Sequence, residues 1–469
     1  MDMEKKYQET LDYLYGFVDY SLTRNFRNAA EKFDLNRMRE LLSLLGNPHQ
    51  KYPIVHVAGT KGKGSTSAMI ASVLQAGGYR TGLYSSPHLI DFTERIQIDQ
   101  LPISPAELCE LVDMIKPVVS RIEGMTTFEI TTALAFMHFA RMGVDYAVIE
   151  VGLGGRLDAT NVVDPLISVI TSISYDHTQV LGDTLTQIAS EKGGIIKPGK
   201  PVVIAPQSSE ARLELERIAS LRNSPKIQVG KDFLYASLAH SLFNQTILVW
   251  PEAEQDLVDH FIETGGRTDW EPARLVIPLL GFHQVENAAT AYASIQTLRE
   301  AGLKIGEEEI KTGFSNVHWP ARFEVVMHDP LIIVDSAHNR DSALKLRLTI
   351  DDYLAGLPVI LLFGASEDKD IDGMFTELLP RVREVVATES THPRACKATE
   401  LIELAHAHGV KTTAVLPLEA ALERAIQLAD GEAAVIAAGS VFIAAGIKEF
   451  LQRKENQAQD IQNPDPGKS

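Results

Sequence analysis

The segment GTKGKGS, residues 59–65, has the composition of a phosphate-binding loop. Its glycines allow backbone N–H groups to face an anion, and a helix that starts there adds a favourable dipole. Lys63 is expected to meet the β- and γ-phosphates of a nucleotide, with Ser65 or Thr66 near a phosphate or a metal ion. In the usual motif a serine or threonine follows the lysine directly, whereas here Gly64 intervenes. The alternative interpretation is a flexible glycine-rich surface turn.

Two further polar side chains follow predicted strands. Glu150 lies at the carboxyl end of the apolar stretch 144–152, and His177 follows the stretch 166–174. In open α/β sheets, ligands bind outside the carboxyl ends of the strands, and a carboxylate there suits Mg²⁺. The alternatives are a solvated glutamate and a structural histidine. Lys192 is ambiguous from chemistry alone, because most lysines are surface charges.

A second group of candidate residues lies in the last third of the chain. Arg322, in WPARFE (319–324), suits bidentate recognition of phosphate. The strand-like stretch that ends in IIVDSAHN (332–339) carries Asp335, His338 and Asn339. A surface arginine and a turn capped by Asn339 are the alternatives.

These residues need elements to position them, and short apolar runs alternate with longer helical patterns along the chain. Strands are predicted at 54–59, 80–86, 144–152, 166–174, 331–335, 358–363, 383–388 and 433–438. Helices are predicted at 64–78, 104–116, 283–302 and, before a turn, within 185–200. Such alternation predicts an α/β fold whose mostly parallel sheets carry helices on both faces.

The candidate residues fall in both parts of the chain, which places a domain boundary near 318–322. We therefore expect a first domain at 1–319 and a smaller α/β domain at 320–455. The less regular stretch 230–275 is interpreted as an insertion or peripheral subdomain. The polar tail, 456–469, is expected to be disordered.

Composition excludes several classes of protein. The chain has 469 residues, of which 45% are hydrophobic and 23% charged, as in ordinary globular proteins. Its two cysteines argue against a disulfide framework or a thiolate metal site and favour a reducing, cytoplasmic compartment. A formal net charge of -18 argues against nucleic-acid binding. We expect no membrane association, because the most apolar run, 433–446, is shorter than the roughly 18 residues that a membrane helix needs.

Eight segments together resemble the Mur ligase superfamily, and within it the folylpolyglutamate synthase/dihydrofolate synthase branch. They are GTKGKGS (59–65), YSSPHL (84–89) with ERI (94–96), EVGLGGRLDATN (150–161), SYDHTQVLG (174–182), IASEKGGIIKPG (188–199), GFHQVENAATA (281–291), WPARFE (319–324) and DSAHN (335–339). They occur in the family's order, and the resemblance covers about residues 5–455. The resemblance implies a P-loop-type ATPase domain, preceded by N-terminal helices, and a Rossmann-like C-terminal domain.

The resemblance also implies roles for individual residues. The ATP contacts that it implies are Gly59, Thr60, Lys61, Gly62, Lys63, Gly64, Ser65, Thr66, Asn287, Arg322 and Asp335. It implies Mg²⁺ ligands at Ser86, Glu150 and His177, and a carbamylated Lys192 that organises a second Mg²⁺. It implies pterin-side contacts at Phe128, Asp158 and Ala159, and contacts near the incoming glutamate at His338 and Ser440. Catalysis is then expected to depend on Lys63, Lys192, His177 and Arg322.

Two positions depart from the family pattern. Ser336 stands where the family usually has glycine, and Gly193 stands where alanine is common. The first departure can alter a tight turn. The second loosens a helix slightly without removing Lys192.

The implied reaction is ATP-dependent addition of L-glutamate to dihydropteroate and to the γ-carboxylate of tetrahydrofolate, through an acyl phosphate and with closure of the second domain. The LDATN form, 157–161, resembles the bifunctional bacterial enzymes, which are mostly monomeric like their relatives. The alternatives are a synthase that only extends the polyglutamate tail, a Mur-type ligase acting on a UDP-muramyl substrate, and an ATP-binding regulatory or scaffold protein without ligase activity.

Overall fold

The protein is described by a computed structural model that covers residues 2–18 and 34–462. It divides into two compact units. The first comprises Met1–Ala239, Thr246–Pro278 and His283–His318, and the second comprises His240–Gln245, Leu279–Phe282 and Trp319–Ser469. The sequence analysis expects a domain boundary near 318–322, and the main stretch of the second unit starts at Trp319.

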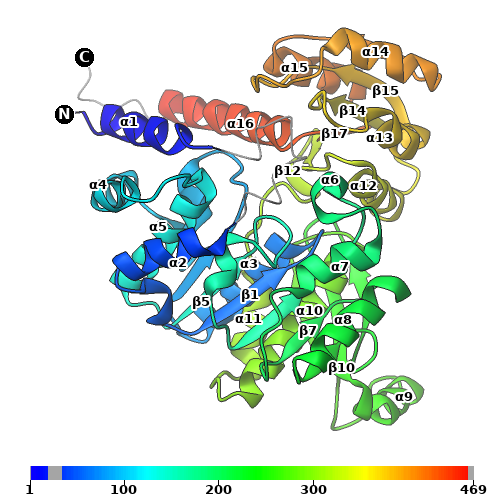
Figure 1. Cartoon of the computed structure of the whole chain (residues 1–469). Coiled ribbons are helices and arrows are strands. Elements are labelled where there is room, and N and C mark those ends of the chain that lie inside the picture. The colour runs from blue at the N-terminus through cyan, green and yellow to red at the C-terminus, as the bar shows by residue number, and fades with distance from the viewer. Residues whose placement is uncertain (1, 19–33, 463–469) are drawn as a thin grey trace. The chain divides into compact units, whose positions relative to one another are not determined.

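The first unit is built on an eight-stranded sheet with the order β4-β3-β2-β5-β1-β6-β7-β8 (Figure 1). Its strands are β1 (Ile54–Ala58), β2 (Thr81–Tyr84), β3 (Ile96–Ile98), β4 (Leu101–Pro102), β5 (Tyr146–Glu150), β6 (Ile167–Ile170), β7 (Val202–Ile204) and β8 (Lys226–Gln228). All neighbours from β2 to β8 are parallel, whereas β3 and β4 continue the sheet antiparallel at one edge. Because β5, β1 and β6 are adjacent and parallel, their carboxyl ends share one edge of the sheet.

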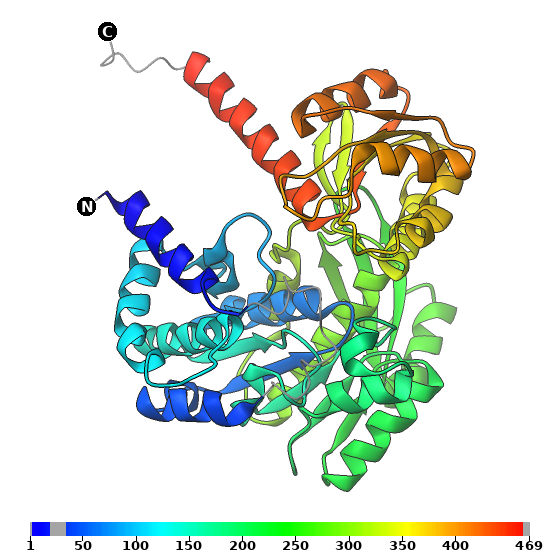
Figure 2. The ribbon, with the colours of Figure 1, turned by 45° about the horizontal axis from the view of Figure 1, so that its top comes forward.

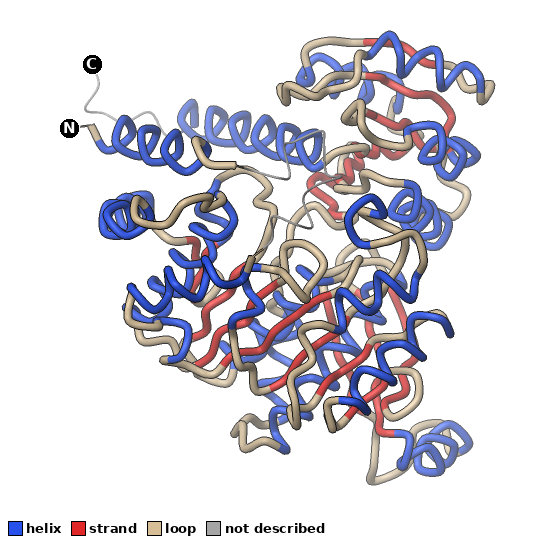
Figure 3. The backbone as a smooth tube through the Cα atoms, viewed as in Figure 1, coloured by secondary structure: helices blue, strands red, loops and turns tan. Residues whose placement is uncertain are grey.

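Helices lie on both sides of this sheet (Figures 1 and 3). In the first unit they are α1 (Met3–Tyr15), α2 (Leu35–Leu44), α3 (Lys63–Ala76), α4 (Pro105–Val119), α5 (Thr127–Met142), α6 (Thr178–Leu181), α7 (Leu185–Gly193), α8 (Ser209–Leu221), α9 (Gln255–Glu263), α10 (Phe282–Glu300) and α11 (Glu307–Ser315). Capping boxes start α4 at Ser104, α5 at Thr126 and α7 at Thr184, so the local sequence fixes where these helices begin.

The core of the first unit lies on the sheet. Ile54, Ala147 and Ile149 pack with residues of α4 and α5 in one apolar cluster. A second cluster joins Ile170 and Ile204 to α7 and α8. The strands are apolar throughout because they are covered on both faces.

A separate three-stranded sheet occupies most of the stretch 230–275. Its order is β11-β10-β9, with β9 at Phe233–His240, β10 at Gln245–Pro251 and β11 at Ala273–Ile277. The sequence predicts an irregular insertion here. Sequence reasoning missed the long β9 because its apolar residues do not alternate with polar ones, and none of its residues is buried.

The second unit holds a six-stranded sheet with the order β12-β13-β17-β14-β15-β16. Its strands are β12 (Glu324–His328), β13 (Leu331–Val334), β14 (Val359–Phe363), β15 (Val382–Ala387), β16 (Thr412–Ala414) and β17 (Ala434–Ala438). Only β12 is antiparallel to its neighbour. The helices are α12 (Arg340–Tyr353), α13 (Ile371–Leu378), α14 (Ala398–Ala407), α15 (Leu418–Ala429) and α16 (Val441–Gln462).

The prediction of a disordered tail at 456–469 is partly wrong. α16 continues to Gln462, so 456–462 are helical, and Figure 2 shows one continuous red helix. The remaining residues, 463–469, lie outside the described part of the chain. Helix-favouring Gln and Ala residues explain why a polar stretch without an apolar stripe extends a helix that is already nucleated.

In the part of the chain that the structure describes, no helix is both long enough and apolar enough to cross a membrane.

Candidate active site

The loop between β1 and α3 is held by backbone contacts to the end of β6. The N–H groups of Thr60 and Lys61 donate to the carbonyl oxygen of Ser172 at 2.8 and 3.1 Å. Gly59 and Gly62 both have left-handed φ values, +153° and +86°. A Cβ at Gly59 would overlap the Thr171 hydroxyl, so glycine is required there for the close approach of the two strands.

The first turn of α3 offers donors to an anion. Gly62 caps this helix without a side-chain hydrogen bond, which leaves backbone N–H groups of the first turn for a ligand. Ser65 and Thr66 are buried, and among the described residues the Thr66 hydroxyl has no hydrogen-bond partner. The amide of Asn287, at the start of α10, lies against the loop, because a Cβ at Gly62 would overlap it.

A carboxylate faces the loop lysine. Glu150, the last residue of β5, has its Oε1 4.0 Å from the Nζ of Lys63. Its Oε2 accepts a hydrogen bond of 3.4 Å from the backbone N–H of Ser86, which follows β2. The structure therefore brings together Lys63, Glu150 and Ser86, as their positions at strand ends predict.

The second loop lysine has its own carboxylate. The Nζ of Lys61 lies 3.0 Å from Asp176 Oδ2, and the neighbouring His177 has a left-handed φ of +49°. The imidazole Nε2 of His177 lies 3.8 Å from Asp176 Oδ1. Sequence reasoning singled out His177 and missed Asp176, although an acidic residue just after the same predicted strand, 166–174, was the available signal.

Lys192 is a buried amine in the last turn of α7. Its Nζ donates to the carbonyl oxygen of Gly59 at 2.8 Å, so it touches the phosphate loop from behind. Burial, reinforced by the cation of Lys63, lowers the pKa of Lys192 to about 7. A substantial fraction of this amine is therefore neutral, and hence nucleophilic, at neutral pH.

The glycine-rich segment 152–158 forms a loop between Phe128 and α7. A Cβ at Gly152 would overlap the Phe128 ring, so the ring rests on this glycine. At the other end, the Arg156 N–H donates to the Glu191 carbonyl in α7 at 2.8 Å. Phe128 also lies 6.0 Å, ring to ring, from Tyr84.

Asp158 and Ala159 are both buried, and Asp158 closes the loop on itself. Its Oδ2 accepts from the Leu153 N–H at 2.9 Å, and its Oδ1 accepts from the Thr160 N–H at 3.0 Å. Burial raises the pKa of Asp158, and these donors oppose that rise. The contact of these two residues with a pterin stays a prediction.

In the second unit, Asp335 organises the turn after β13. Its carboxylate accepts from the N–H groups of Phe323 and Ala337, both at 2.7 Å, and burial raises its pKa. Arg322 donates to the Ala321 carbonyl at 2.9 Å and to the hydroxyl of Ser336. The serine that replaces the family's usual glycine thus contacts the predicted phosphate-binding arginine.

His338 and Ser440 follow neighbouring parallel strands, β13 and β17. The Nδ1 of His338 lies 2.9 Å from the Ser336 carbonyl oxygen, and the hydroxyl of Ser440 accepts from the Phe442 N–H at 3.2 Å. Both therefore lie at the carboxyl edge of the second sheet, as the sequence predicts for ligand-binding positions.

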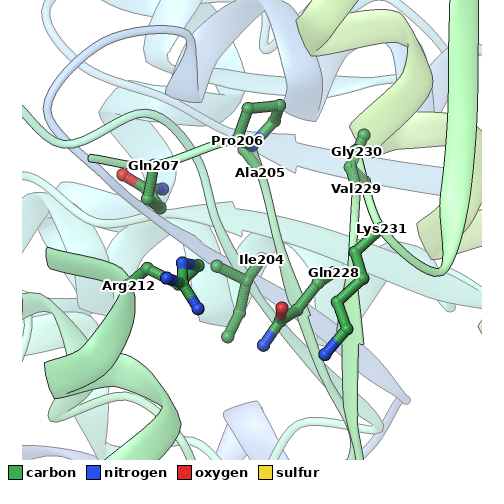
Figure 4. Close-up of a pocket in the computed structure, with 9 residues that line it drawn as sticks. All are labelled: Ile204, Ala205, Pro206, Gln207, Arg212, Gln228, Val229, Gly230 and Lys231. Atoms are coloured by element: carbon green, nitrogen blue, oxygen red, sulfur yellow. The ribbon is translucent and has the colours of Figure 1, made fainter. Parts of the chain in front are cut away.

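A cavity of about 270 Å³ opens at the carboxyl ends of β7 and β8 (Figure 4). Arg212, Gln228 and Lys231 are among its lining residues. It contains none of the predicted site residues. Gln207, on its wall, binds the Ile173 N–H at 2.9 Å and so supports the strand end behind the phosphate loop.

With this geometry in place, comparisons with known proteins identify the class. Residues 57–295 match the family model of the Mur ligase middle domain, and residues 321–441 match that of the Mur ligase glutamate ligase domain. The fold and the phosphate loop thus define an ATP-dependent ligase of the Mur type.

Individual relatives narrow the class. The chain is 37% identical over 398 residues to the dihydrofolate synthase/folylpolyglutamate synthase of Bacillus subtilis, covering 82% of this chain and 89% of the relative. It is 30% identical over 448 residues to the Escherichia coli protein of the same name, covering 93% and 95%. The chain belongs to the dihydrofolate synthase/folylpolyglutamate synthase family, as the eight segments predict.

Solved structures agree with this assignment. Mycobacterium tuberculosis folylpolyglutamate synthase complexed with ADP has a TM-score of 0.81 at 30% identity, covering 96% of this chain and 99% of that one. Escherichia coli FolC in complex with DHPP and ADP has a TM-score of 0.80 at 28% identity, covering 96% and 98%.

Proposed function

We propose that this ligase joins L-glutamate to the carboxylate of a folate-type acceptor while ATP is converted to ADP and phosphate. The observation that carries the proposal is the phosphate loop with Lys63 beside Glu150, on the same sheet edge as the loop that supports Phe128. Family membership supports the choice of acceptor, because the relatives bear the names dihydrofolate synthase and folylpolyglutamate synthase.

The reaction needs the acceptor carboxylate to be activated. A carboxylate oxygen attacks the γ-phosphorus of ATP, the bond to the β–γ bridging oxygen breaks, and ADP leaves an acyl phosphate. The amine of glutamate then attacks the acyl carbon and loses a proton. The tetrahedral intermediate collapses by expelling phosphate, which leaves an amide.

The chain's own residues contribute mainly position and charge. Lys63 and the N–H groups at the start of α3 would hold the β- and γ-phosphates, and Asn287 would contact the base or ribose. Exclusion of water matters because hydrolysis of the acyl phosphate would waste ATP. Phe128 and the loop 152–158 would bind the pterin side of the acceptor.

The residues around Glu150 suit Mg²⁺. This ion prefers oxygen ligands and is commonly held by one or two carboxylates together with substrate phosphates. Glu150 and the hydroxyl of Ser86 supply such oxygens beside the phosphate loop. The described residues contain no cluster of three or more His, Cys, Asp or Glu side chains suited to a metal. The phosphates of ATP would supply further oxygen ligands. Bound Mg²⁺ would neutralise charge on the phosphoryl group being transferred, with His177 as a third protein ligand.

Lys192 is proposed to be carbamylated. Its neutral amine would attack CO₂, forming an N–C bond and releasing a proton, so a buried cation becomes an anion. Its lowered pKa of about 7 and its neighbours Lys63 and Lys61 support this change, since an anion there would be attracted rather than repelled. Such a carbamate could organise a second Mg²⁺.

The second unit is proposed to contribute to the same reaction. Arg322 would bind the γ-phosphate, and Asp335 the ribose or base of ATP. His338 and Ser440 would contact the incoming glutamate, because they lie at the ligand-binding edge of their sheet.

We further propose activity with both dihydropteroate and tetrahydrofolate as acceptors, in a cytoplasmic monomer. The dihydrofolate synthase/folylpolyglutamate synthase name of the relatives supports two activities. The two cysteines, Cys109 and Cys396, are buried and unpaired, which suits a reducing compartment.

The test is ADP release by the purified protein with Mg²⁺, ATP and glutamate, comparing 7,8-dihydropteroate with tetrahydrofolate. Turnover with both acceptors is expected. Turnover with tetrahydrofolate alone would leave only tail extension, and turnover with neither would contradict the proposal.

A further inference from the structure

A histidine lies inside the central strand of the first sheet. His56, in the middle of β1, is fully buried between β5 and β6 and is polar within an otherwise apolar strand. Its Nε2 lies 2.8 Å from the hydroxyl oxygen of Thr160. None of the roles assigned above uses this residue.

The hydroxyl of Thr160 in turn donates to Oδ1 of Asp158, which the Thr160 backbone N–H also binds at 3.0 Å. The three side chains therefore form a buried chain from the core of the sheet to Asp158. Asp158 closes the loop 152–158 through its bond from the Leu153 N–H.

Proton positions along this chain are constrained. Because the Thr160 hydroxyl proton points to Asp158, the Thr160 oxygen is left to accept from His56. Burial lowers the pKa of His56 to about 3, so its ring is neutral and carries one N–H. That proton must then reside on Nε2, and Nδ1 is unprotonated.

The other ring nitrogen shows that packing alone does not explain this residue. Nδ1 of His56 is buried and, among the described residues, has no hydrogen-bond partner. An apolar ring of similar size would avoid this unsatisfied acceptor. What the histidine adds is one fixed donor aimed at Thr160.

The loop that this chain supports connects two parts of the site. Gly152 carries the ring of Phe128, and Arg156 binds the end of α7, the helix of Lys192. Movement of the Asp158 carboxylate would release Leu153 and shift Gly152 under Phe128. The phosphate loop has bonds of its own, from the Thr60 and Lys61 N–H groups to the Ser172 carbonyl oxygen.

We propose that His56 is a positioning residue, which orients Asp158 through Thr160 and thereby sets the shape of the acceptor subsite at Phe128. This inference rests on the proposed function for its substrate but not for its geometry. In this proposal β1 has two roles. It positions the phosphate loop at its carboxyl end, and through His56 it influences acceptor binding.

Two matched pairs of variants test it. In His56→Gln an amide N–H can reach the position of Nε2, whereas in His56→Asn the amide ends near Nδ1. Thr160→Ser keeps the hydroxyl, and Thr160→Val removes it at similar volume. We expect His56→Asn and Thr160→Val to raise the KM for dihydropteroate about tenfold, the effect of losing one buried hydrogen bond, with the KM for ATP unchanged. His56→Gln and Thr160→Ser should stay within about twofold of the natural protein.

An equal rise in both KM values, or identical behaviour within each pair, would overturn the proposal, because a merely structural role predicts either result. A second measurement does not need activity or a variant that folds. Nitrogen-15 NMR of histidine-labelled protein should show the His56 ring as the neutral Nε2–H tautomer, and an Nδ1–H tautomer would overturn the chain. If the natural protein ligates glutamate to no folate acceptor, the proposed function fails. The tautomer of His56 still tests the hydrogen-bonded chain from His56 to Asp158.

Discussion

At the scale of single residues, the most informative group is the amine of Lys192. This amine is buried, lies close to two other lysines and is bonded to a backbone carbonyl. Burial and the neighbouring positive charges disfavour its cationic form. The same surroundings favour its neutral form and, after reaction with CO₂, its anionic carbamate. The chemistry proposed for Lys192 therefore follows from its position behind the phosphate loop.

Lys192→Arg should lower kcat by roughly 10²–10³-fold, the usual effect of removing one strong electrostatic contributor, because a guanidinium neither loses its charge nor forms a carbamate. The natural protein should lose activity when CO₂ is stripped from the buffer and regain it with bicarbonate. Lys197→Met is the control, because Lys197 is partly buried with a pKa lowered to about 8 but binds Asn161 instead. Full activity of Lys192→Arg, or the same CO₂ dependence in that variant, would contradict the assignment.

His56 predicts how stability depends on pH. Its pKa is about 3 in the folded protein and 6.5 ordinarily, so between these values the unfolded chain binds more protons. The free energy of unfolding should therefore fall as pH drops below 6.5, with a contribution from this residue of up to about 1.4 kcal/mol per pH unit.

Urea unfolding of the natural protein and of His56→Gln measures how the free energy of unfolding changes with pH. Measurements between about pH 4 and 8 span most of the titration range of a histidine. The variant should show a shallower decline, since glutamine does not titrate. Parallel curves would mean that the histidine is protonated in the folded protein or accessible to water.

At the scale of elements, the phosphate loop depends on the left-handed turn at Gly62. Gly62→Ala adds a Cβ that overlaps the amide of Asn287 and strains a φ of +86°. We expect the KM for ATP to rise about tenfold or more, since the substitution would displace the backbone N–H groups that are proposed to bind the phosphates. Gly78→Ala is the matched control, because its φ is +82° but nothing lies within 4 Å of the added Cβ.

In that comparison both variants should lose stability by about 1 kcal/mol from backbone strain, and only Gly62→Ala should change nucleotide binding. Calorimetric titration with ADP separates the two effects. An ADP affinity that is unchanged in Gly62→Ala would mean that this turn does not shape the nucleotide site.

The elements also show what the sequence could and could not predict. β1, β5 and β6 follow from their apolar runs, and the sheet edge they share follows from the alternation of strands and helices. The antiparallel strands β3 and β12 did not follow, because periodicity carries no information on strand direction.

Within the site, predictability depended on chain distance. Lys63 and the loop glycines were found because seven consecutive residues carry the signal. The bond between Lys192 and the Gly59 carbonyl joins positions 133 residues apart, and only the folded chain reveals it. The His56–Thr160 contact was missed because a single histidine in an apolar strand is ordinarily interpreted as core.

At the scale of the whole molecule, both units are proposed to contribute residues to one reaction. Arg322→Lys should lower kcat/KM for ATP by roughly 10²-fold, because a planar guanidinium binds phosphate in a bidentate manner and an ammonium does not. Arg340→Lys is the control in the same unit, since Arg340 forms an exposed pair with Glu377. Unchanged steady-state kinetics in Arg322→Lys would mean that the first unit alone handles ATP.

The most direct test of the central claim follows oxygen atoms. Dihydropteroate labelled with ¹⁸O in its carboxylate is incubated with the protein, Mg²⁺, ATP and L-glutamate, and the released phosphate is analysed by mass spectrometry. Attack of the carboxylate on ATP predicts that one ¹⁸O passes to phosphate for each amide formed. Amide formation without ¹⁸O in the phosphate, or ADP release without any amide, would contradict ligation through an acyl phosphate.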